Sequence, residues 1–270
     1  MIPVIVMGAA GRMGAQIIGL LRDHKELSLA AAIEYQAHAA IGRDAGEAVG
    51  GEKIGVTVTP DLPRALKQGR VVIDFTSPEV TVETAGLAAN AGVPLVIGTT
   101  GLTEAQQKAL KAAAKKVAVL YSPNMSIGVN LLFQLASQAA KALGPSYDIE
   151  ITEAHHRMKK DAPSGTALHL ARLLADATGR TLEQAAVYSR HGLDAARQTG
   201  QIGIQSIRGG DIVGDHTVLF AGAGERLELV HRAASRDNFA RGALLAARWI
   251  VDQPSGFYSM QHLLNAQGKR

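Results

Sequence analysis

Short apolar runs alternate with amphipathic segments along the first half of the chain. Runs at 2–7, 27–33, 71–75, 94–97 and 117–121 have the length and composition of buried strands, and helical spacing follows several of them, as at Ile17, Ile18 and Leu21 and again at 84–90. Strands that alternate with helices in this way predict a parallel, doubly wound sheet.

The pattern changes near residue 126. After a helical stretch at 130–143 come strand-like runs at 147–152, 187–190, 202–208, 211–220 and 226–233. Gly209-Gly210 and Gly222–Gly224 separate two pairs of these runs as hairpin turns would, which predicts a largely antiparallel or mixed sheet. A last helix at 238–251, with the only tryptophan, Trp249, in the core, is expected to return to the first domain.

These patterns predict an α/β protein with two domains. Residues 1–126 and 237–270 would form a doubly wound, Rossmann-like domain, and residues 127–236 a smaller α+β domain with a mixed sheet.

A glycine turn follows the first strand, with the sequence Gly8-Ala9-Ala10-Gly11-Arg12-Met13-Gly14. Strand, glycine turn and helix in this order resemble a dinucleotide-binding fingerprint, although the spacing is GxxGxxG rather than GxGxxG. Glu34 ends the second strand about twenty residues beyond Gly14, where an acid would bind the adenosine ribose. The alternative is an ordinary surface glutamate.

Polar and glycine residues end three further predicted strands, at 74–77, 98–101 and 122–125. Ligands bind at the carboxyl ends of the strands in such sheets. Each of these segments alone would be an ordinary loop, but together they are expected to outline one cleft.

The stretch 153–167 (EAHHRMKKDAPSGTA) concentrates the chemistry of the second domain. It connects the 147–152 strand to a helix at 166–178, for which Ser164 is the expected N-cap and Gly179 the expected C-cap. Open amides at the helix start, with Gly165 beside them, would bind an anion. His155, His156 and Lys159 would add proton donors and positive charge. The alternative is a solvated basic loop, and a metal site is not expected because adjacent strand residues point to opposite faces.

Composition narrows the possibilities further. The 270 residues include no cysteine, which excludes disulfides and thiolate catalysis and favours a cytoplasmic protein. The net charge of +4 comes from scattered residues and aromatics are only 4%, so we expect anionic ligands but no nucleic acid. Neither a signal-peptide pattern nor a membrane-length apolar run is present, so no membrane association is expected.

Seven segments in order along the chain resemble the dihydrodipicolinate reductase (4-hydroxy-tetrahydrodipicolinate reductase) family of lysine and diaminopimelate biosynthesis. They are GAAGRMG, VVIDFTSPE, VIGTTG, SPNMSIGVN, EAHHRMKKDAPSGTA, RGGDIVGDH and HRAASRDNFARGA. The resemblance implies that a hydride from NADH or NADPH reduces the cyclic dicarboxylate 4-hydroxy-tetrahydrodipicolinate with loss of water. It also implies a cytoplasmic homotetramer joined through the substrate-domain sheets.

The resemblance also implies roles for individual residues. The cofactor would be bound by Gly8, Ala9, Ala10, Gly11, Arg12, Met13, Glu34, Gly98, Thr99, Thr100, Ser122, Pro123, Asn124 and Met125. His155 would be the acid/base residue and Lys159 a proton donor. His156, Gly165 and Thr166 would bind the substrate.

Two positions depart from the family pattern. Many members carry an arginine after the ribose-binding acid, where this chain has Tyr35, and some carry a basic residue in place of Ser77. An arginine there would pair with the 2′-phosphate of NADPH, so we expect NADH to be used at least as well. Two alternatives remain: a related NAD(P)-dependent dehydrogenase of another small amino or keto acid, and a non-enzymatic dinucleotide sensor.

Overall fold

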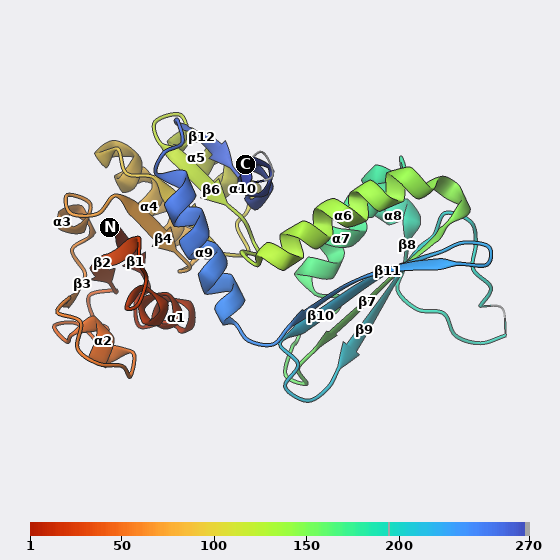
Figure 1. Cartoon of the computed structure of the whole chain (residues 1–270), viewed down its shortest axis with the longest axis horizontal. Helices are drawn as coiled ribbons and strands as arrows, with labels where there is room; N and C mark the ends of the chain where they lie inside the picture. The colour runs from red at the N-terminus through yellow and green to blue at the C-terminus, as the bar shows by residue number, and fades with distance from the viewer. Residues whose placement is uncertain (194, 268–270) are drawn as a thin grey trace. The chain divides into compact units, whose positions relative to one another are not determined.

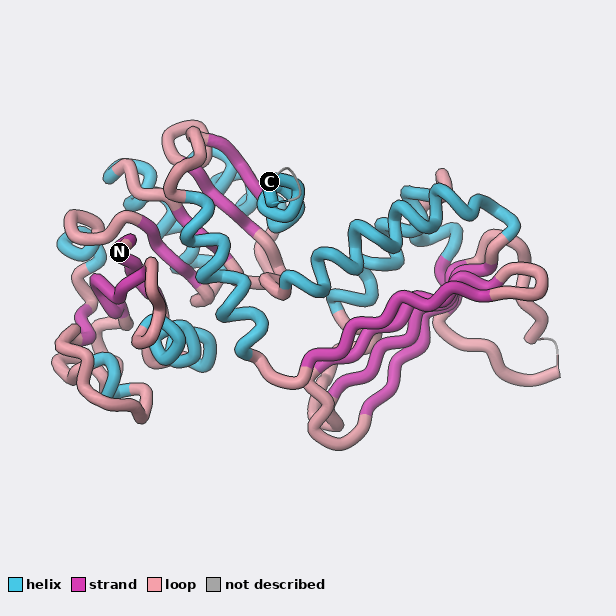
Figure 2. Tube along the Cα trace, in the orientation of Figure 1, coloured by secondary structure: helices cyan, strands magenta, loops and turns pink. Residues whose placement is uncertain are grey.

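The computed structural model describes residues 1–193 and 195–267, and it divides into two compact units. The first unit is Met1–Ile127 with the segment that begins at Asp237, and the second is Gly128–Arg236. Figure 1 labels the helices and strands, and Figure 2 separates them by colour. Each unit has its own sheet and its own hydrophobic core.

The sheet of the first unit has seven strands, all parallel, in the order β12-β6-β5-β4-β1-β2-β3. The order reverses between the neighbours β1 and β4, which makes this the topological switch point where such sheets bind ligands. The strands are β1 (Ile2–Met7), β2 (Leu27–Ile33), β3 (Val58–Thr59), β4 (Val71–Asp74), β5 (Leu95–Ile97), β6 (Ala118–Tyr121) and β12 (Gly256–Tyr258).

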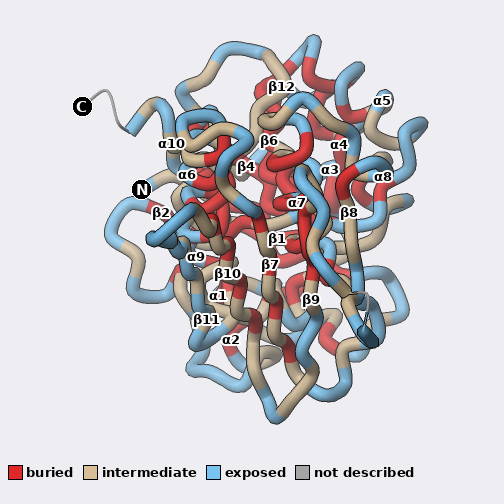
Figure 3. Tube along the Cα trace, turned by 90° about the vertical axis from the view of Figure 1, so that its right-hand side faces the viewer, coloured by how far each residue is buried: buried red, intermediate tan, exposed pale blue. Residues whose placement is uncertain are grey.

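Helices bury both faces of this sheet, which explains why its strands read as continuous apolar runs. Val4 and Val6 of β1 pack into a core with α1, α9 and α10, whereas Ile5 and Met7 face the core under α3, α4 and α5. Figure 3 colours the buried residues of both units red, and they include most residues of β1, β4, β5 and β6. The helices are α1 (Arg12–Leu21), α2 (Ala45–Ala48), α3 (Leu62–Ala65), α4 (Pro78–Ala91), α5 (Glu104–Ala113), α9 (Asp237–Ile250) and α10 (Met260–Gln267).

The sheet of the second unit has five strands in the order β11-β10-β7-β9-β8. β10 pairs antiparallel with β11 and β7, while β9 pairs parallel with β7 and β8, so the sheet is mixed as predicted. The helices α6, α7 and α8 cover one face, as Figure 1 shows. The elements are α6 (Ile127–Leu143), η1 (Gly144–Ser146), β7 (Asp148–His155), α7 (Gly165–Ala177), α8 (Leu182–Ala185), β8 (Ala186–Val187), β9 (Ile202–Arg208), β10 (Gly214–Ala221) and β11 (Arg226–Ala233).

Most predicted elements are present, and α9 returns to the first unit as predicted, with Trp249 packed against its core. Three predictions were wrong. The strand predicted at 187–190 ends at Val187, and the one predicted at 211–220 begins only at Gly214. Gly209-Gly210 does not form a hairpin turn, because β7 lies between β9 and β10 in the sheet. Pairing with the distant β7 outweighs the local turn signal.

Candidate active site

The glycine turn at the end of β1 has the geometry of a nucleotide-binding loop. Gly8 has a φ of +60°, a conformation that favours glycine, and its carbonyl accepts the Gly11 N–H at 3.0 Å. A Cβ on Gly14 would lie 2.1 Å from the Gly8 oxygen, so α1 packs directly on the turn. No side chain caps α1 at Gly11, which leaves the amides of its first turn open toward an anion.

Glu34 closes the other side of this turn. One carboxylate oxygen accepts the Ala10 N–H at 2.9 Å and the other accepts the Tyr35 N–H at 3.3 Å, and the residue is buried. It is therefore not the ordinary surface glutamate of the alternative interpretation. The Tyr35 side chain, by contrast, is 66% exposed and packs edge-on against His38.

The tips of β4, β5 and β6 are joined by hydrogen bonds, as expected for one continuous edge. The Gly98 N–H donates to the Asp74 carbonyl at 2.8 Å, and the Ser122 N–H donates to the Ile97 carbonyl at 3.1 Å. Asp74 is buried, and burial raises the pKa of its carboxyl despite hydrogen bonds from the Thr76 amide and hydroxyl. The hydroxyls of Thr81 and Thr99 lie 2.8 Å apart, which ties α4 to the loop after β5.

Two of the predicted cofactor residues also have packing roles. A Cβ on Gly98 would lie 2.1 Å from the Phe75 ring, so this glycine makes room for a neighbouring side chain. Met125 has its side chain in the core, and its carbonyl lies against Gly242 of α9. Thr100 and Pro123 are exposed, whereas Ala9, Thr99 and Ser122 are buried.

In the second unit, the predicted stretch connects β7 to α7. β7 ends at His155, and Ser164 caps α7 by accepting the Ala167 N–H at 3.2 Å. Gly179, with a φ of +71°, ends the helix as predicted. Nothing lies within 4 Å of a Cβ placed on Gly165, so the space beside the first turn of α7 is open. This is the arrangement that an anion site requires.

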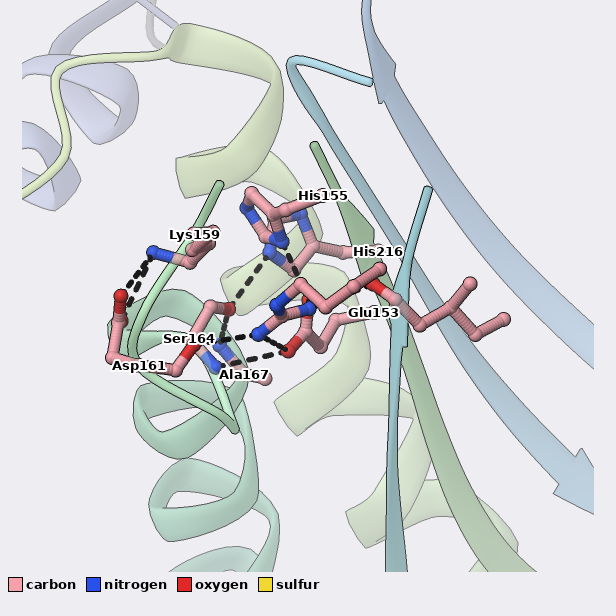
Figure 4. A network of polar contacts seen from close by, with 9 residues as sticks. Glu153, His155, Lys159, Asp161, Ser164, Ala167 and His216 are labelled. Atoms are coloured by element: carbon pink, nitrogen blue, oxygen red, sulfur yellow. Dashed lines mark hydrogen bonds and ion pairs between the residues drawn. The ribbon is translucent and has the colours of Figure 1, made fainter. Parts of the chain in front are cut away.

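A buried polar network lies beside this helix start (Figure 4). Glu153, which is fully buried, accepts hydrogen bonds from His155 Nδ1 at 2.5 Å, from the Ser164 N–H at 3.1 Å and from two nitrogens of Arg208 at 2.8 and 2.9 Å. Burial raises the pKa of Glu153, but these donors, Arg208 first among them, outweigh burial and lower it to about 2. Glu153 is therefore ionised at neutral pH.

The imidazole of His155 is buried and lies beside that of His216, with 5.2 Å between the ring centroids. Burial lowers the pKa of His155 and Glu153 raises it, while the charges of Lys159 and Arg208 lower it further. The net direction is downward, so burial favours the neutral imidazole, whose free ring nitrogen can accept a proton.

Lys159 and His156 lie on the loop after β7. Lys159 Nζ pairs with both carboxylate oxygens of Asp161, at 2.8 and 2.9 Å, while the Lys159 N–H donates to the His156 carbonyl at 3.0 Å. The hydrogen bond from Lys159 lowers the pKa of Asp161. Lys159 is thus a partly buried ammonium group on the same short loop as the start of α7.

His216 makes the second unit sensitive to acid. Burial, and the nearby His155 and His231, lower the pKa of His216 to about 3. Below pH about 6.5 the unfolded chain binds a proton at this residue that the folded chain does not, so stability falls as the pH falls. We expect acidification from pH 7 to pH 5 to lower the free energy of unfolding of the wild type by about 2 kcal/mol more than that of His216→Gln.

Chemical denaturation of both proteins at the two pH values measures this difference. His191→Gln, which removes a histidine from an exposed segment, is the control. An equal loss of stability on acidification in wild type and His216→Gln would contradict the prediction.

Sequence reasoning missed Glu153, Arg208 and His216. A signal for Glu153 was present in the sequence, because it shares one face of the strand with Ile149, Ile151 and His155. A carboxylate on a buried face requires a partner. Arg208 is that partner, but it comes from β9, 55 residues away, and no pattern in the sequence predicts that β7 pairs with β9.

The residues of the first unit fit a dinucleotide. The open first turn of α1 suits a pyrophosphate, and Glu34 lies at the end of β2 where a ribose would be bound. Among the described residues, no group of three or more His, Asp or Glu side chains could hold a metal ion. No helix in the described part of the chain is both long and apolar enough to cross a membrane. The parallel sheet with its glycine turn places the first unit in the class of dinucleotide-binding domains.

The sequence matches two family models along nearly its whole length. Residues 2–125 match the dihydrodipicolinate reductase N-terminus and residues 128–264 match the dihydrodipicolinate reductase C-terminus. The chain is 52% identical, over 99% of both sequences, to the 4-hydroxy-tetrahydrodipicolinate reductase of Anaeromyxobacter dehalogenans. It is 50% identical to the same enzyme of Syntrophobacter fumaroxidans, over 98% of this chain and 99% of that one.

A solved structure agrees with these matches. The dihydrodipicolinate reductase of Paenisporosarcina sp. TG-14, with dipicolinate bound, superposes with a TM-score of 0.78 at 26% identity, and 96% of this chain and 97% of that chain are covered. The chain belongs to the dihydrodipicolinate reductase family, and it is therefore an NAD(P)H-dependent oxidoreductase. The predicted family, fold class and enzyme class are confirmed.

Proposed function

We propose that this protein reduces 4-hydroxy-tetrahydrodipicolinate to tetrahydrodipicolinate with NADH or NADPH, in lysine and diaminopimelate biosynthesis. The observation that carries the proposal is the Glu153–His155 pair beside the open start of α7, in a chain that belongs to this family. The pair provides a proton-transfer group and the helix start provides an anion site. A reductase of a cyclic dicarboxylate needs both.

The first unit is the dinucleotide-binding domain in this proposal. The amides at Gly11–Met13 would hold the cofactor pyrophosphate and Glu34 the adenosine ribose, while the loops at 98–100 and 122–125 would surround the nicotinamide. The cofactor supplies the hydride when it is bound. The protein's part is to position the cofactor and keep water from the reacting atoms.

The second unit is the substrate-binding domain. The amides of Gly165 and Thr166 would bind one substrate carboxylate, because the first turn of α7 is a site for anions. His156 and Lys159 would add hydrogen bonds and positive charge from the adjoining loop. Dipicolinate, which is bound to the Paenisporosarcina reductase, is a dicarboxylate of the same kind as the proposed substrate.

Proton transfer falls to His155 and Lys159. The overall reaction adds one hydride and one proton to the substrate and releases one water. Lys159 is a partly buried cation on the loop that leads to α7 and would deliver a proton. His155 would exchange a proton through Nε2, since its Nδ1 is held by Glu153.

A cytoplasmic homotetramer is the assembly that we propose. The face of the second sheet away from α6 and α7 carries Ile207 and Val230, which are 50% and 46% exposed. These exposed apolar side chains on a sheet face support pairing with a second copy. Sedimentation of the purified protein measures the assembly.

The lack of cysteine supports a reducing compartment for this protein. We propose neither a nucleic-acid nor a membrane partner.

The test is an absorbance assay with purified protein and freshly prepared 4-hydroxy-tetrahydrodipicolinate. Oxidation of NADH or NADPH that depends on the substrate supports the proposal. Tight cofactor binding without oxidation would favour a dehydrogenase of another amino or keto acid, or a dinucleotide sensor. Other small keto acids and amino acids, tested in the same assay, separate these two outcomes.

The same assay tests cofactor choice. Tyr35 follows Glu34 and is exposed, so no cation at this position meets the 2′-phosphate of NADPH. We expect the wild type to have a KM for NADH no higher than that for NADPH. Tyr35→Arg should lower the KM for NADPH by about tenfold, the effect of about 1.4 kcal/mol from one charge-assisted pair. A clear preference of the wild type for NADPH would contradict this.

A further inference from the structure

We propose that Glu153 is the positioning residue of His155, and that Arg208 locks Glu153 in place. This inference rests on the proposed function, in which His155 moves a proton. The role of Glu153 is to fix the orientation of the imidazole and the nitrogen that exchanges its proton. It also links His155 to the cap of the anion-binding helix.

The first argument is the completeness of the hydrogen bonding around Glu153. A carboxylate has about four acceptor positions. Here donors occupy all of them: two Arg208 nitrogens, His155 Nδ1, the Ser164 N–H and the Ser206 hydroxyl. A buried carboxylate with all its positions filled cannot rotate without breaking several bonds at once, so it is a rigid support for the imidazole.

Arg208 is itself held on two sides. Its Nη2 donates to the Asp161 carbonyl at 2.6 Å, and its Nη1 donates to the Ile207 carbonyl at 2.7 Å. The guanidinium therefore spans β9, β7 and the loop that leads to α7. A bidentate pair with this geometry fixes direction as well as distance.

The second argument concerns the tautomer of His155. Because Glu153 is ionised and accepts from His155 Nδ1, that nitrogen must carry a proton whether the ring is neutral or charged. The exchangeable proton is then confined to Nε2. This nitrogen would lie 3.0 Å from a Cβ on Gly214, so the glycine leaves the space in which Nε2 lies.

Charged and titratable groups face His155 from every neighbouring element. Glu153 lies on the same strand, Arg208 on β9, His216 on β10 and Lys159 on the following loop. Among these, Glu153 alone carries a negative charge, and it raises the pKa of His155 while burial and the two cations lower it. Removing this charge must therefore lower the pKa of His155.

The third argument is the bond to Ser164. The same carboxylate that holds His155 also accepts the N–H of the residue that caps α7. The proton-transfer group and the start of the anion site are thus fixed to one buried group (Figure 4). A substrate carboxylate bound at α7 would be held at a constant position relative to His155 Nε2.

The first experiment measures the tautomer directly in the wild-type protein. Nitrogen-15 NMR of the histidine side chains, with His155 assigned by its loss in His155→Gln, distinguishes protonated from unprotonated ring nitrogens. At a pH where His155 is neutral, we expect a proton on Nδ1 and none on Nε2. A neutral ring protonated on Nε2 would overturn the proposal without any assumption about activity.

The second experiment replaces the carboxylate by an amide. Glu153→Gln keeps the shape but allows the amide to donate, so the ring can adopt either tautomer. We expect kcat to fall about 10²-fold or more, with the dissociation constant for NADH unchanged. The limb of the pH profile that reports His155 should move to lower pH, and Glu153→Asp, which keeps the charge, should recover part of kcat.

Glu150→Gln is the matched control. Glu150 lies on the same strand, on the opposite face, and pairs with Arg190 and Arg197 at 2.9 and 3.2 Å. The control loses the same charge and the same kind of ion pair, but it has no histidine partner. Because Glu150 lies on the sheet face proposed for assembly, sedimentation checks that the variant assembles as the wild type does. With its assembly unchanged, its kcat and pH profile should remain close to wild type.

The outcomes separate this inference from the proposed function. Wild-type turnover of 4-hydroxy-tetrahydrodipicolinate tests the function alone. Suppose that the wild type is active and that Glu153→Gln has the wild-type kcat, the wild-type pH profile and the wild-type tautomer of His155. The positioning role of Glu153 is then wrong, while the proposed function stands. A loss of kcat in Glu153→Gln equal to that in Glu150→Gln, with no movement of the pH profile, would show a purely structural effect and would also overturn it.

Discussion

Replacing Lys159 by alanine is expected to lower kcat by about 10³-fold, within the range that a positioned acid or base contributes, while the affinity for NADH remains that of the wild type. The reason is the position of its ammonium group. Lys159 is partly buried, two positions before Asp161 and five before the cap of α7, on the loop that leads to the proposed carboxylate site. The cofactor residues lie on other segments of the chain.

The neighbouring Lys160 provides the control. It has the same charge and lies on the same loop, but its side chain is exposed. Lys160→Ala should therefore keep most of kcat. Steady-state kinetics give kcat for both variants, and fluorescence titration gives the dissociation constant for NADH. Unchanged turnover in Lys159→Ala would remove Lys159 from the mechanism, and weaker NADH binding would show a disturbance beyond the loop.

The kinetic constants of Lys159→Ala distinguish two roles of its ammonium group, attraction of the substrate and donation of a proton. The Asp161 carboxylate holds the Lys159 ammonium at 2.8 Å in the free protein. If Lys159 acts only by attracting the substrate, its removal should raise KM and leave kcat unchanged. If it donates a proton in the transition state, kcat and kcat/KM should fall together. The proposed role requires the second result.

The first sheet was predictable because its strands carry the signal themselves. A strand buried on both faces, such as β1 or β5, is an uninterrupted apolar run, and parallel strands need the helices that the sequence also shows. β12, with three residues, was missed because Gly256, Phe257 and Tyr258 are too few to establish a period. It forms because it pairs with β6.

For the second sheet, the sequence predicts that parallel and antiparallel strands are mixed, but not which strands pair. β7 and β10 alternate, so the sequence specifies which of their faces is buried but not which strand lies beside which. For this reason the sequence predicts a hairpin turn at Gly209-Gly210, whereas β7 separates the two strands that this segment connects. The Glu153–Arg208 pair was missed for the same reason, since the pairing of β7 with β9 brings the two residues together.

The glycine turn provides the second large expected effect. Gly14→Ala should weaken NADH binding by at least about 100-fold, equivalent to about 2.7 kcal/mol. The added Cβ would lie 2.1 Å from the Gly8 oxygen and 2.8 Å from Ala9. Backbone atoms cannot yield as the end of a flexible side chain can. The helix must therefore move away from the turn, and the amides that would hold the pyrophosphate move with it.

Gly19 lies on the same helix and serves as the matched control, because nothing lies within 4 Å of a Cβ placed there. Gly19→Ala should leave NADH affinity unchanged and should raise the free energy of unfolding by up to about 1 kcal/mol, since alanine is the better helix former. Titration with NADH and chemical denaturation of both variants measure the two effects. Wild-type affinity in Gly14→Ala would mean that the turn does not hold the cofactor. Equal losses of affinity in both variants would mean that α1 as a whole, rather than its contact with Gly8, governs binding.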